Sequence, residues 1–300
     1  MKAELAYQKM YLIRKFEEKS FELFSDGHIK GTIHTCIGQE AVAVGVGANV
    51  NLEKDIVFSN HRGHGHFLAT YGGEKVFELF SEIMGKQTGI CAGTGGTQHI
   101  HYKNYYSNGI LGGIVPISTG MAFAEKNKNS KAITVTFLGD GTFGEGVVYE
   151  SFNIASKWSL PVVFCIENNF YAQTTPVEMA HSGTLSERGL LFGIKTFKDT
   201  SNDITSIYNT AMEAFAFVRT EGIPVILYTE TYRLSPHSKG DDFRDKKEIE
   251  KMKAIDPLIK VEHLLNKNVV NKIKVKTDKI INEAAKKAIE SPKSKFIDLN

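Results

Sequence analysis

The apolar positions along the chain follow two kinds of pattern, and the first, a helical spacing, marks several helices. Residues 3–25 carry apolar side chains at roughly helical spacing, with Gly27 and Gly31 just beyond, so they predict an amphipathic helix. The small, apolar run 38–50 (GQEAVAVGVGANV) is consistent with a second, tightly packed helix. Further segments with helical patterns are residues 74–84, 117–127, 144–158, 204–219 and 278–290.

The second pattern is the short, continuous apolar run, which is typical of a buried strand. Four such runs occur, at residues 55–59 (DIVFS), 132–140 (AITVTFLGD), 160–169 (LPVVFCIENN) and 224–232 (PVILYTETY). Because these strands alternate with helical segments, we predict an α/β fold in which a parallel sheet carries helices on both faces.

Two stretches depart from this regular alternation. Glycine is dense between Gly85 and Gly113, which predicts a long irregular segment, and long ordered loops in compact domains are usually functional. From Lys246 onwards the chain is rich in lysine and glutamate. We predict a single domain over residues 1–300, with an N-terminal helical segment (1–50) and a C-terminal helical extension (246–300).

Composition and charge argue against several classes of protein. The chain has 300 residues, of which 42% are hydrophobic and 23% charged, and its net charge of +2 gives no strong field toward nucleic acid or membranes. Its three cysteines are widely spaced and form no disulfide framework. The sequence has no secretory signal and no apolar run long enough to span a bilayer. We therefore expect a cytoplasmic protein with no nucleic-acid or membrane partner.

Residues 60–66 (NHRGHGH) follow the first predicted strand and concentrate three histidines and one arginine. Histidine is the commonest metal ligand and the usual proton shuttle near neutral pH. The local spacing alone is compatible with a metal site, an acid–base site, an anion-binding loop or a purely polar loop.

Oxygen-bearing side chains stand at the ends of two predicted strands. Asp140, between Gly139 and Gly141, ends one strand, and Asn168 and Asn169 end the next. Ligands of open parallel sheets bind outside the carboxyl ends of the strands, and neighbouring strands lie about 5 Å apart, so Asp140 and an asparagine can converge on one ion. Such oxygen donors suit Mg²⁺ or Ca²⁺, and glycines let a diphosphate approach the backbone. The pattern therefore indicates a divalent metal and a diphosphate at the edge of the sheet.

Each motif alone is compatible with an ordinary turn. Together they resemble the thiamine diphosphate motif, in which GDG is followed after 26 residues by NN. The surrounding blocks resemble the alpha subunit of the two-subunit decarboxylating component of 2-oxo acid dehydrogenase complexes, a group that includes acetoin dehydrogenase alpha subunits. These blocks span nearly the whole chain: GTIHTCIGQEAVAVGVG, HRGHGH, GTGGTQHIH, NGILGGIVPISTG, GDGTFGEGVVYESFNIASKWSLPVVFCIENNFYA and TYRLSPHSKGDDFRD. The resemblance implies the thiamine diphosphate-binding fold.

The resemblance also implies roles for individual residues. Mg²⁺ would be bound by the side chains of Asp140 and Asn169 and by the backbone carbonyl of Tyr171. Arg62 would grip the diphosphate, a task that suits a guanidinium fork. The other cofactor contacts would come from His61, Gly109, Leu111, Gly139, Gly141, Thr142 and His237. The candidates for proton transfer and oxyanion stabilisation would be His34, His64 and His237.

The implied reaction is carbanion chemistry carried by thiamine diphosphate. Pyruvate or a branched-chain 2-oxo acid would lose CO₂, or acetoin would be cleaved, and the acyl group would pass to a lipoyl-bearing acyltransferase. The resemblance further implies a beta subunit that supplies an activating glutamate, within an α₂β₂ heterotetramer. HRGHGH and YAQTTPVE are similar to acetoin dehydrogenases, whereas YRLSPHSKGDDFRD is similar to branched-chain enzymes, so the substrate stays open.

Two alternatives share part of this pattern. One is a transketolase-like or synthase half-enzyme that acts on other carbonyl substrates, and the other is a structural paralogue that binds metal and cofactor poorly. The HRGHGH and PHSKGDD blocks favour the dehydrogenase over the first alternative, and the presence of Asp140, Asn169, Arg62 and His237 argues against the second.

Overall fold

A mostly parallel sheet forms the centre of the structure, a computed structural model that describes residues 1–238, 240 and 242–295. Within these residues the strand order is β2–β3–β1–β4–β5–β9–β8, and β2 and β3 form the one antiparallel pair of that sheet. Its strands are β1 (Ile56–Ser59), β2 (His101–Tyr102), β3 (Tyr105–Ser107), β4 (Thr134–Gly139), β5 (Val162–Asn168), β8 (Lys195–Asp199) and β9 (Val225–Glu230). A separate small hairpin consists of β6 (Tyr171–Ala172) and β7 (Thr175–Pro176).

The central strands β4 and β5 show why continuous apolar runs form this sheet. Successive side chains of a strand point to opposite faces. Phe137 and Cys165 enter one buried apolar cluster, whereas Leu138 and Phe164 enter the other. Both faces are therefore covered, which is why neither strand shows a polar side.

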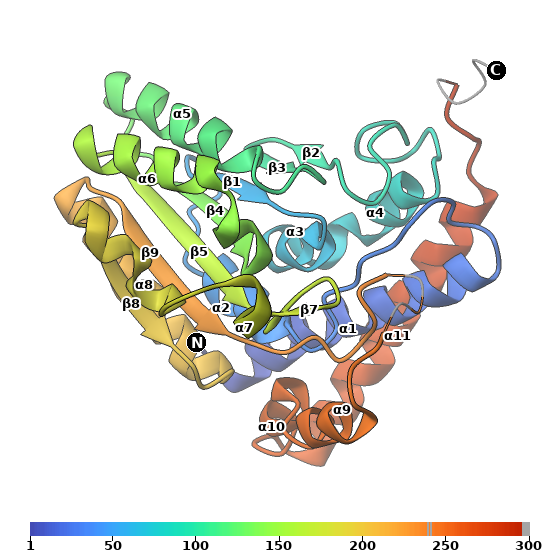
Figure 1. Cartoon of the computed structure of the whole chain (residues 1–300). Helices are drawn as coiled ribbons and strands as arrows, with labels where there is room; N and C mark the ends of the chain where they lie inside the picture. The colour runs from blue at the N-terminus through green and yellow to red at the C-terminus, as the bar shows by residue number, and fades with distance from the viewer. Residues whose placement is uncertain (239, 241, 296–300) are drawn as a thin grey trace.

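Helices cover both faces of the sheet (Figure 1). The apolar cluster on one face includes α5 (Ile114–Asn127) and α6 (Gly146–Lys157). The cluster on the other face includes α1 (Ala3–Ser25), α2 (Glu40–Gly47), α3 (Gly63–Tyr71), α4 (Val76–Ile83), α8 (Ile204–Glu221) and α11 (Lys267–Glu290). The predicted α/β class, a parallel sheet with helices on both faces, is confirmed.

The C-terminal helices pack against the N-terminal ones. Arg14 on α1 donates hydrogen bonds to Glu40 on α2 and to Asp256, which caps α10 (Pro257–Glu262). α11 packs against α1 and α4, and α9 (Lys246–Lys253) precedes α10. The remaining helical turns are η1 (Gly72–Lys75), η2 (Gly141–Gly144), α7 (Val177–Ala180) and η3 (Leu185–Phe192). Over the described ranges, no helix combines the length and apolar character needed to cross a membrane.

Several elements differ from the sequence expectation. The glycine-dense segment is mainly irregular, as predicted, but it also contributes β2 and β3. β8 escapes prediction because it is a partly exposed edge strand without an apolar run. α11 begins at Lys267 rather than at residue 278, because Val270 and Ile273 extend its buried face and the Asn266 side chain caps its first turn.

Candidate functional site

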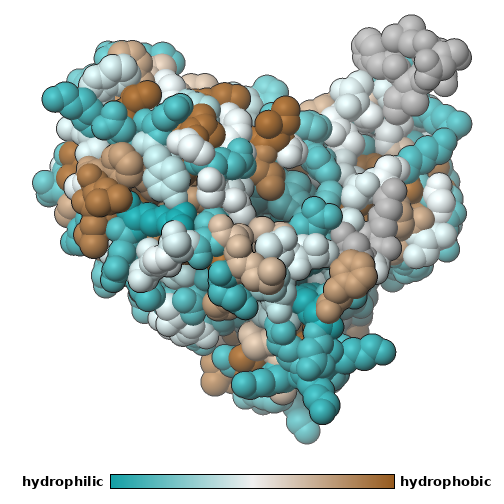
Figure 2. All heavy atoms as spheres, viewed as in Figure 1, coloured by the Kyte–Doolittle hydropathy of each residue, from teal (hydrophilic) through white to brown (hydrophobic). Residues whose placement is uncertain are grey.

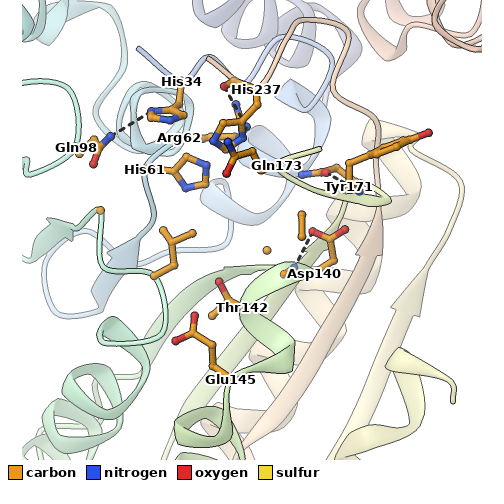
Figure 3. Close-up of a pocket in the computed structure, with 16 residues that line it drawn as sticks. His34, His61, Arg62, Gln98, Asp140, Thr142, Glu145, Tyr171, Gln173 and His237 are labelled. Carbon is orange, nitrogen blue, oxygen red and sulfur yellow. Dashed lines mark hydrogen bonds between the residues drawn. The ribbon is translucent and has the colours of Figure 1, made fainter. Parts of the chain in front are cut away.

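Loops that follow five neighbouring parallel strands converge on one cavity of about 390 Å³ (Figure 3). These strands are β3, β1, β4, β5 and β9. The cavity is lined by His34, His61, Arg62, Gln98, Gly109, Leu111, Gly139, Asp140, Gly141, Thr142, Glu145, Asn169, Tyr171, Ala172, Gln173 and His237. The structure thus brings the sequence-predicted site residues together, with the exception of His64.

Asp140 follows β4 and is 2% exposed. One of its carboxylate oxygens accepts the N–H of Gly141 at 3.0 Å, whereas Oδ2 is buried and has no hydrogen-bond partner among the described residues. Burial raises the pKa of this carboxyl from 3.8 to about 6. Because a buried carboxylate is costly unless a cation or a donor satisfies it, Asp140 is suited to bind one.

The two asparagines at the end of β5, the strand next to β4, have different partners. Asn168 donates its amide to the hydroxyl of Tyr228 on β9 at 2.7 Å, so it ties two strands together. Asn169 lines the cavity, and its Oδ1 accepts the N–H of Tyr171 at 3.2 Å. The two side chains predicted to share one cation, Asp140 and Asn169, therefore lie on the same cavity.

Side chains pack closely against two of the glycines on the cavity. A Cβ on Gly141 would lie 2.8 Å from the Cβ of Ala172, and a Cβ on Gly109 would lie 2.1 Å from a side-chain oxygen of Gln98. A Cβ on Gly139 would meet no described atom within 4 Å. The fixed Cβ of Ala172 therefore requires a glycine at position 141, whereas a side chain at position 109 would displace the flexible end of Gln98, and Gly139 borders open space.

Arg62 brings a buried positive charge to the cavity, where it is 5% exposed. Its guanidinium donates to the carbonyl oxygen of Thr35 at 2.6 Å and to Nδ1 of His237 at 3.1 Å. Burial, together with repulsion from the nearby Arg233, lowers the pKa of Arg62 to about 9. Two arginines held close together away from water favour an anion at this end of the cavity.

Three histidine rings form a cluster beside Arg62. The ring centroid of His34 lies 4.8 Å from those of His61 and His237. Because a guanidinium can only donate, Nδ1 of His237 accepts from Arg62, and in the neutral ring Nε2 then carries the proton. The amide of Gln98 donates to Nδ1 of His34 at 3.2 Å and favours the same tautomer there (Figure 3).

His61 differs from the other two rings, because both of its nitrogens are buried without a hydrogen-bond partner in the described part of the chain. Burial, with added repulsion from Arg62, lowers the pKa of His61 well below its ordinary range. The neutral ring offers one donor and one acceptor to a ligand. No group of three or more His, Cys, Asp or Glu within residues 1–238, 240 and 242–295 has the arrangement of a metal site, so the histidine cluster is no metal cage.

His64 is not among the residues that line the cavity, and its predicted role in proton transfer stays a prediction. Helix α3 turns its ring into the core, where it is 0% exposed and its Nδ1 lies 3.2 Å from the carboxylate of Glu17 on α1. His66 is buried as well, 2.8 Å from the hydroxyl of Ser59 and 3.2 Å from the carboxylate of Glu167. Once the helix has begun, its rotation directs these rings into the core and away from the cavity.

Four cavity residues escape sequence prediction: Gln98, Glu145, Ala172 and Gln173. The signal that could reveal them is their position, since each lies inside or next to a motif block. His181 is a further case, because its Nε2 contacts the backbone carbonyl of Asp140 at 2.9 Å from 41 residues away. Contacts of this kind depend on the fold and leave no local pattern.

The fold of the chain is similar to that of a transketolase. The structure resembles a transketolase from Leishmania mexicana with a TM-score of 0.60 at 16% identity. The likeness covers 96% of this chain but 46% of the transketolase chain, so this chain spans less than half of that protein. At this identity the comparison shows the fold alone.

Comparison of sequences identifies the family. The family model for the dehydrogenase E1 component matches residues 8–297. The alpha subunit of the Rickettsia felis pyruvate dehydrogenase E1 component is 39% identical, with 96% of this chain and 91% of that protein covered. The alpha subunit of Bacillus subtilis acetoin:2,6-dichlorophenolindophenol oxidoreductase is 38% identical, with 91% and 80% covered. This chain belongs to the dehydrogenase E1 component family.

Membership of this family confirms the resemblance drawn from the sequence motifs. It also confirms that the chain is of the enzyme type predicted, the alpha subunit of a 2-oxo acid or acetoin dehydrogenase, and it implies thiamine diphosphate as the cofactor. The transketolase-like alternative rests on a distant likeness in fold, whereas the dehydrogenase relatives match over most of the sequence.

Proposed function

We propose that this chain binds thiamine diphosphate with Mg²⁺ held by Asp140, Asn169 and the backbone carbonyl of Tyr171, and that it decarboxylates a 2-oxo acid or cleaves acetoin. The observation that carries the proposal is the buried Oδ2 of Asp140, which has no partner among the described residues and belongs to the same cavity as Asn169 and Arg62. Oxygen donors beside a buried guanidinium fit a hard cation that also binds a diphosphate. The hydroxyl of Thr142, likewise buried with no partner in the described ranges, is available to that ligand.

The residues of the chain bind and orient, while the bound cofactor supplies the carbanion chemistry that breaks a carbon–carbon bond of the substrate. Arg62 would neutralise the charge of the diphosphate. Gly109 and Leu111, which line the same cavity, would offer backbone groups to the aminopyrimidine ring. His34 and His237 each carry a hydrogen on Nε2 in the arrangement described above, so each neutral ring can donate a hydrogen bond to a substrate oxygen.

We further propose a beta subunit that covers the apolar face beside the cavity. Figure 2 shows hydrophobic side chains gathered over α5 and α6. Phe123, Ile154 and Trp158 line a groove there, and Trp158 is 50% exposed. Ile110, between cavity residues Gly109 and Leu111, is 70% exposed, so a further apolar side chain is accessible next to the cavity. Exposed apolar surface of this extent is typical of protein interfaces, and both relatives described above are named as alpha subunits.

The assembly that we propose is an α₂β₂ heterotetramer whose beta subunit contributes the activating glutamate. A lipoyl-bearing acyltransferase receives the acyl group. The names of the relatives cover both pyruvate and acetoin, so the substrate is a small carbonyl compound with an oxygen on the adjacent carbon. A cytoplasmic location stays a prediction.

Co-expression with the beta subunit, followed by a substrate panel, tests this proposal. The panel contains pyruvate, 2-oxobutyrate, branched-chain 2-oxo acids and acetoin, with and without thiamine diphosphate and Mg²⁺. We expect turnover of one substrate class that requires both additions and is lost in Asp140→Ala. Undiminished thiamine diphosphate binding in Asp140→Ala would refute the site, and a lone chain as active as the co-expressed pair would refute the role of the beta subunit.

A further inference from the structure

The turn that follows β5 adopts a strained backbone conformation. Phe170 and Gln173, neither of which is glycine, have φ angles of 68° and 59° and flank Tyr171 and Ala172. Such left-handed conformations cost of order 1 kcal/mol or more for non-glycine residues and persist only where the surroundings hold them. We name residues 169–173 the β5 turn. Because its two left-handed conformations are unfavourable, contacts from outside the β5 turn must stabilise it.

Two contacts from distant parts of the chain hold the β5 turn. At one end, the guanidinium of Arg233, which is 2% exposed, donates to the backbone carbonyl of Gln173 at 3.0 Å. Nearer the middle, the hydroxyl of Tyr171 donates to both carboxylate oxygens of Glu248, at 3.0 and 2.9 Å. Glu248 lies on α9, 77 residues further along the chain.

Glu248 joins the β5 turn to the segment that follows β9. It accepts a second hydroxyl, that of Tyr232, at 2.7 Å. The guanidinium of Arg244 lies 5.6 Å from the ring centroid of Tyr171 and 5.0 Å from that of Tyr232, and it donates to the carbonyl oxygen of Ser235 at 2.9 Å. Cation–π contacts of this geometry add to the hydrogen bonds. The carboxylate of Glu248 is therefore the common acceptor on which two tyrosines converge.

Helix α9 gains little from apolar burial in this position. It is a polar helix, and none of its residues is buried. Its contact with the β5 turn is therefore made by a specific carboxylate and not by general packing.

We propose that Glu248 is a positioning residue that fixes the β5 turn, so that Asn169 and Tyr171 are held ready for the cation, although Glu248 itself is not among the residues that line the cavity. The proposal rests on the proposed function, since it assigns Mg²⁺ to that turn. It adds a residue of the C-terminal extension to the support of the cofactor site.

The test uses the full chain purified with its beta subunit. Glu248→Ala removes both acceptors, Glu248→Gln keeps the reach and one acceptor oxygen, and Tyr171→Phe removes the donor from the other side. Glu250→Ala is the matched control, because Glu250 lies on the same helix and its one side-chain partner among the described residues is Lys253, in an exposed ion pair. Two quantities are measured: amide hydrogen exchange of residues 169–173 without cofactor, and the Mg²⁺ concentration that half-saturates thiamine diphosphate binding.

For Glu248→Ala we expect exchange in the β5 turn to rise at least about tenfold and the half-saturating Mg²⁺ concentration to rise about tenfold, since a charge-assisted hydrogen bond is lost. At saturating Mg²⁺ and cofactor, kcat stays near that of the wild type. Glu248→Gln has a smaller effect, Tyr171→Phe matches Glu248→Ala, and Glu250→Ala changes neither quantity.

Faster exchange confined to residues 242–253, with unchanged Mg²⁺ dependence, would overturn the proposal, because Glu248 would then only dock its own helix. If the wild type bound no thiamine diphosphate with Mg²⁺, the proposed function would fail instead. In that event the exchange of the β5 turn in the cofactor-free protein still decides whether Glu248 holds it.

Discussion

The segment NHRGHGH divides into two parts that lie in opposite environments. His61, just before α3, lies on the cavity, and both of its ring nitrogens lack a partner in the described part of the protein. His64 and His66, inside α3, lie in the core, where each faces a buried carboxylate, that of Glu17 or Glu167. One residue type therefore lies on the cavity before the start of the helix and in the core after it. Position in the chain, and not residue type, decides the environment of each ring.

The largest effect should follow from removing the cavity charge next to His61. Arg62→Ala deletes the guanidinium that we assign to the diphosphate, so we expect thiamine diphosphate to bind about a hundredfold more weakly at saturating Mg²⁺, as for a lost charged hydrogen-bond pair. Titration calorimetry measures this loss. Arg62→Lys keeps the positive charge but loses the paired N–H donors of the guanidinium. Its affinity for thiamine diphosphate should lie between that of the wild type and that of Arg62→Ala. Unchanged affinity in Arg62→Ala would remove Arg62 from the site.

A core substitution should instead change stability. His64→Phe keeps a ring of similar size but leaves the buried Glu17 carboxylate without its imidazole partner. We expect the free energy of unfolding to fall by about 2 kcal/mol, with cofactor affinity unchanged. Urea denaturation measures the first quantity and calorimetry the second. Weaker cofactor binding at full stability would show that His64 belongs with the cavity residues after all.

Replacing His61, which lies on the cavity, by phenylalanine should lower activity and leave stability nearly unchanged. His61→Phe removes two buried nitrogens that have no partner among the described residues, so we expect the free energy of unfolding to change by no more than about 0.5 kcal/mol. Because a ligand loses a hydrogen-bonding group, kcat/KM should fall about tenfold. If His61→Phe and His64→Phe lost equal stability and no activity, the contrast between the two parts of the segment would disappear.

The smallest effect at neutral pH concerns Asp140. Because burial raises its pKa to about 6, a cation must displace a proton below that pH, so we expect Mg²⁺ affinity to be constant above pH 7 and to fall about tenfold per unit below pH 6. In the cofactor-free protein the raised pKa favours folding at acid pH, and that contribution is lost as the pH rises through 6. Mg²⁺ titrations from pH 5 to 8 measure the profile. A flat profile would contradict the assignment of Asp140.

Much of the site could be predicted because it depends on local order. Asp140 and Asn169 each follow a buried apolar run, and parallel strands bring such ends together. The resemblance to the family then supplied residues without a local pattern, such as His34 and His237. What could not be predicted depends on distant contacts or helical rotation. His64 faces the core because of its phase in α3, and Glu248 reaches Tyr171 across 77 residues.

We propose above that oxygen donors at the strand ends, and not the histidine cluster, hold the metal. Anomalous diffraction from crystals of the full assembly with thiamine diphosphate and Mn²⁺ in place of Mg²⁺ tests it most directly. We expect one strong peak within coordination distance of the Asp140 and Asn169 side chains. A peak bound by His34, His61 and His237, with none at Asp140, would contradict it.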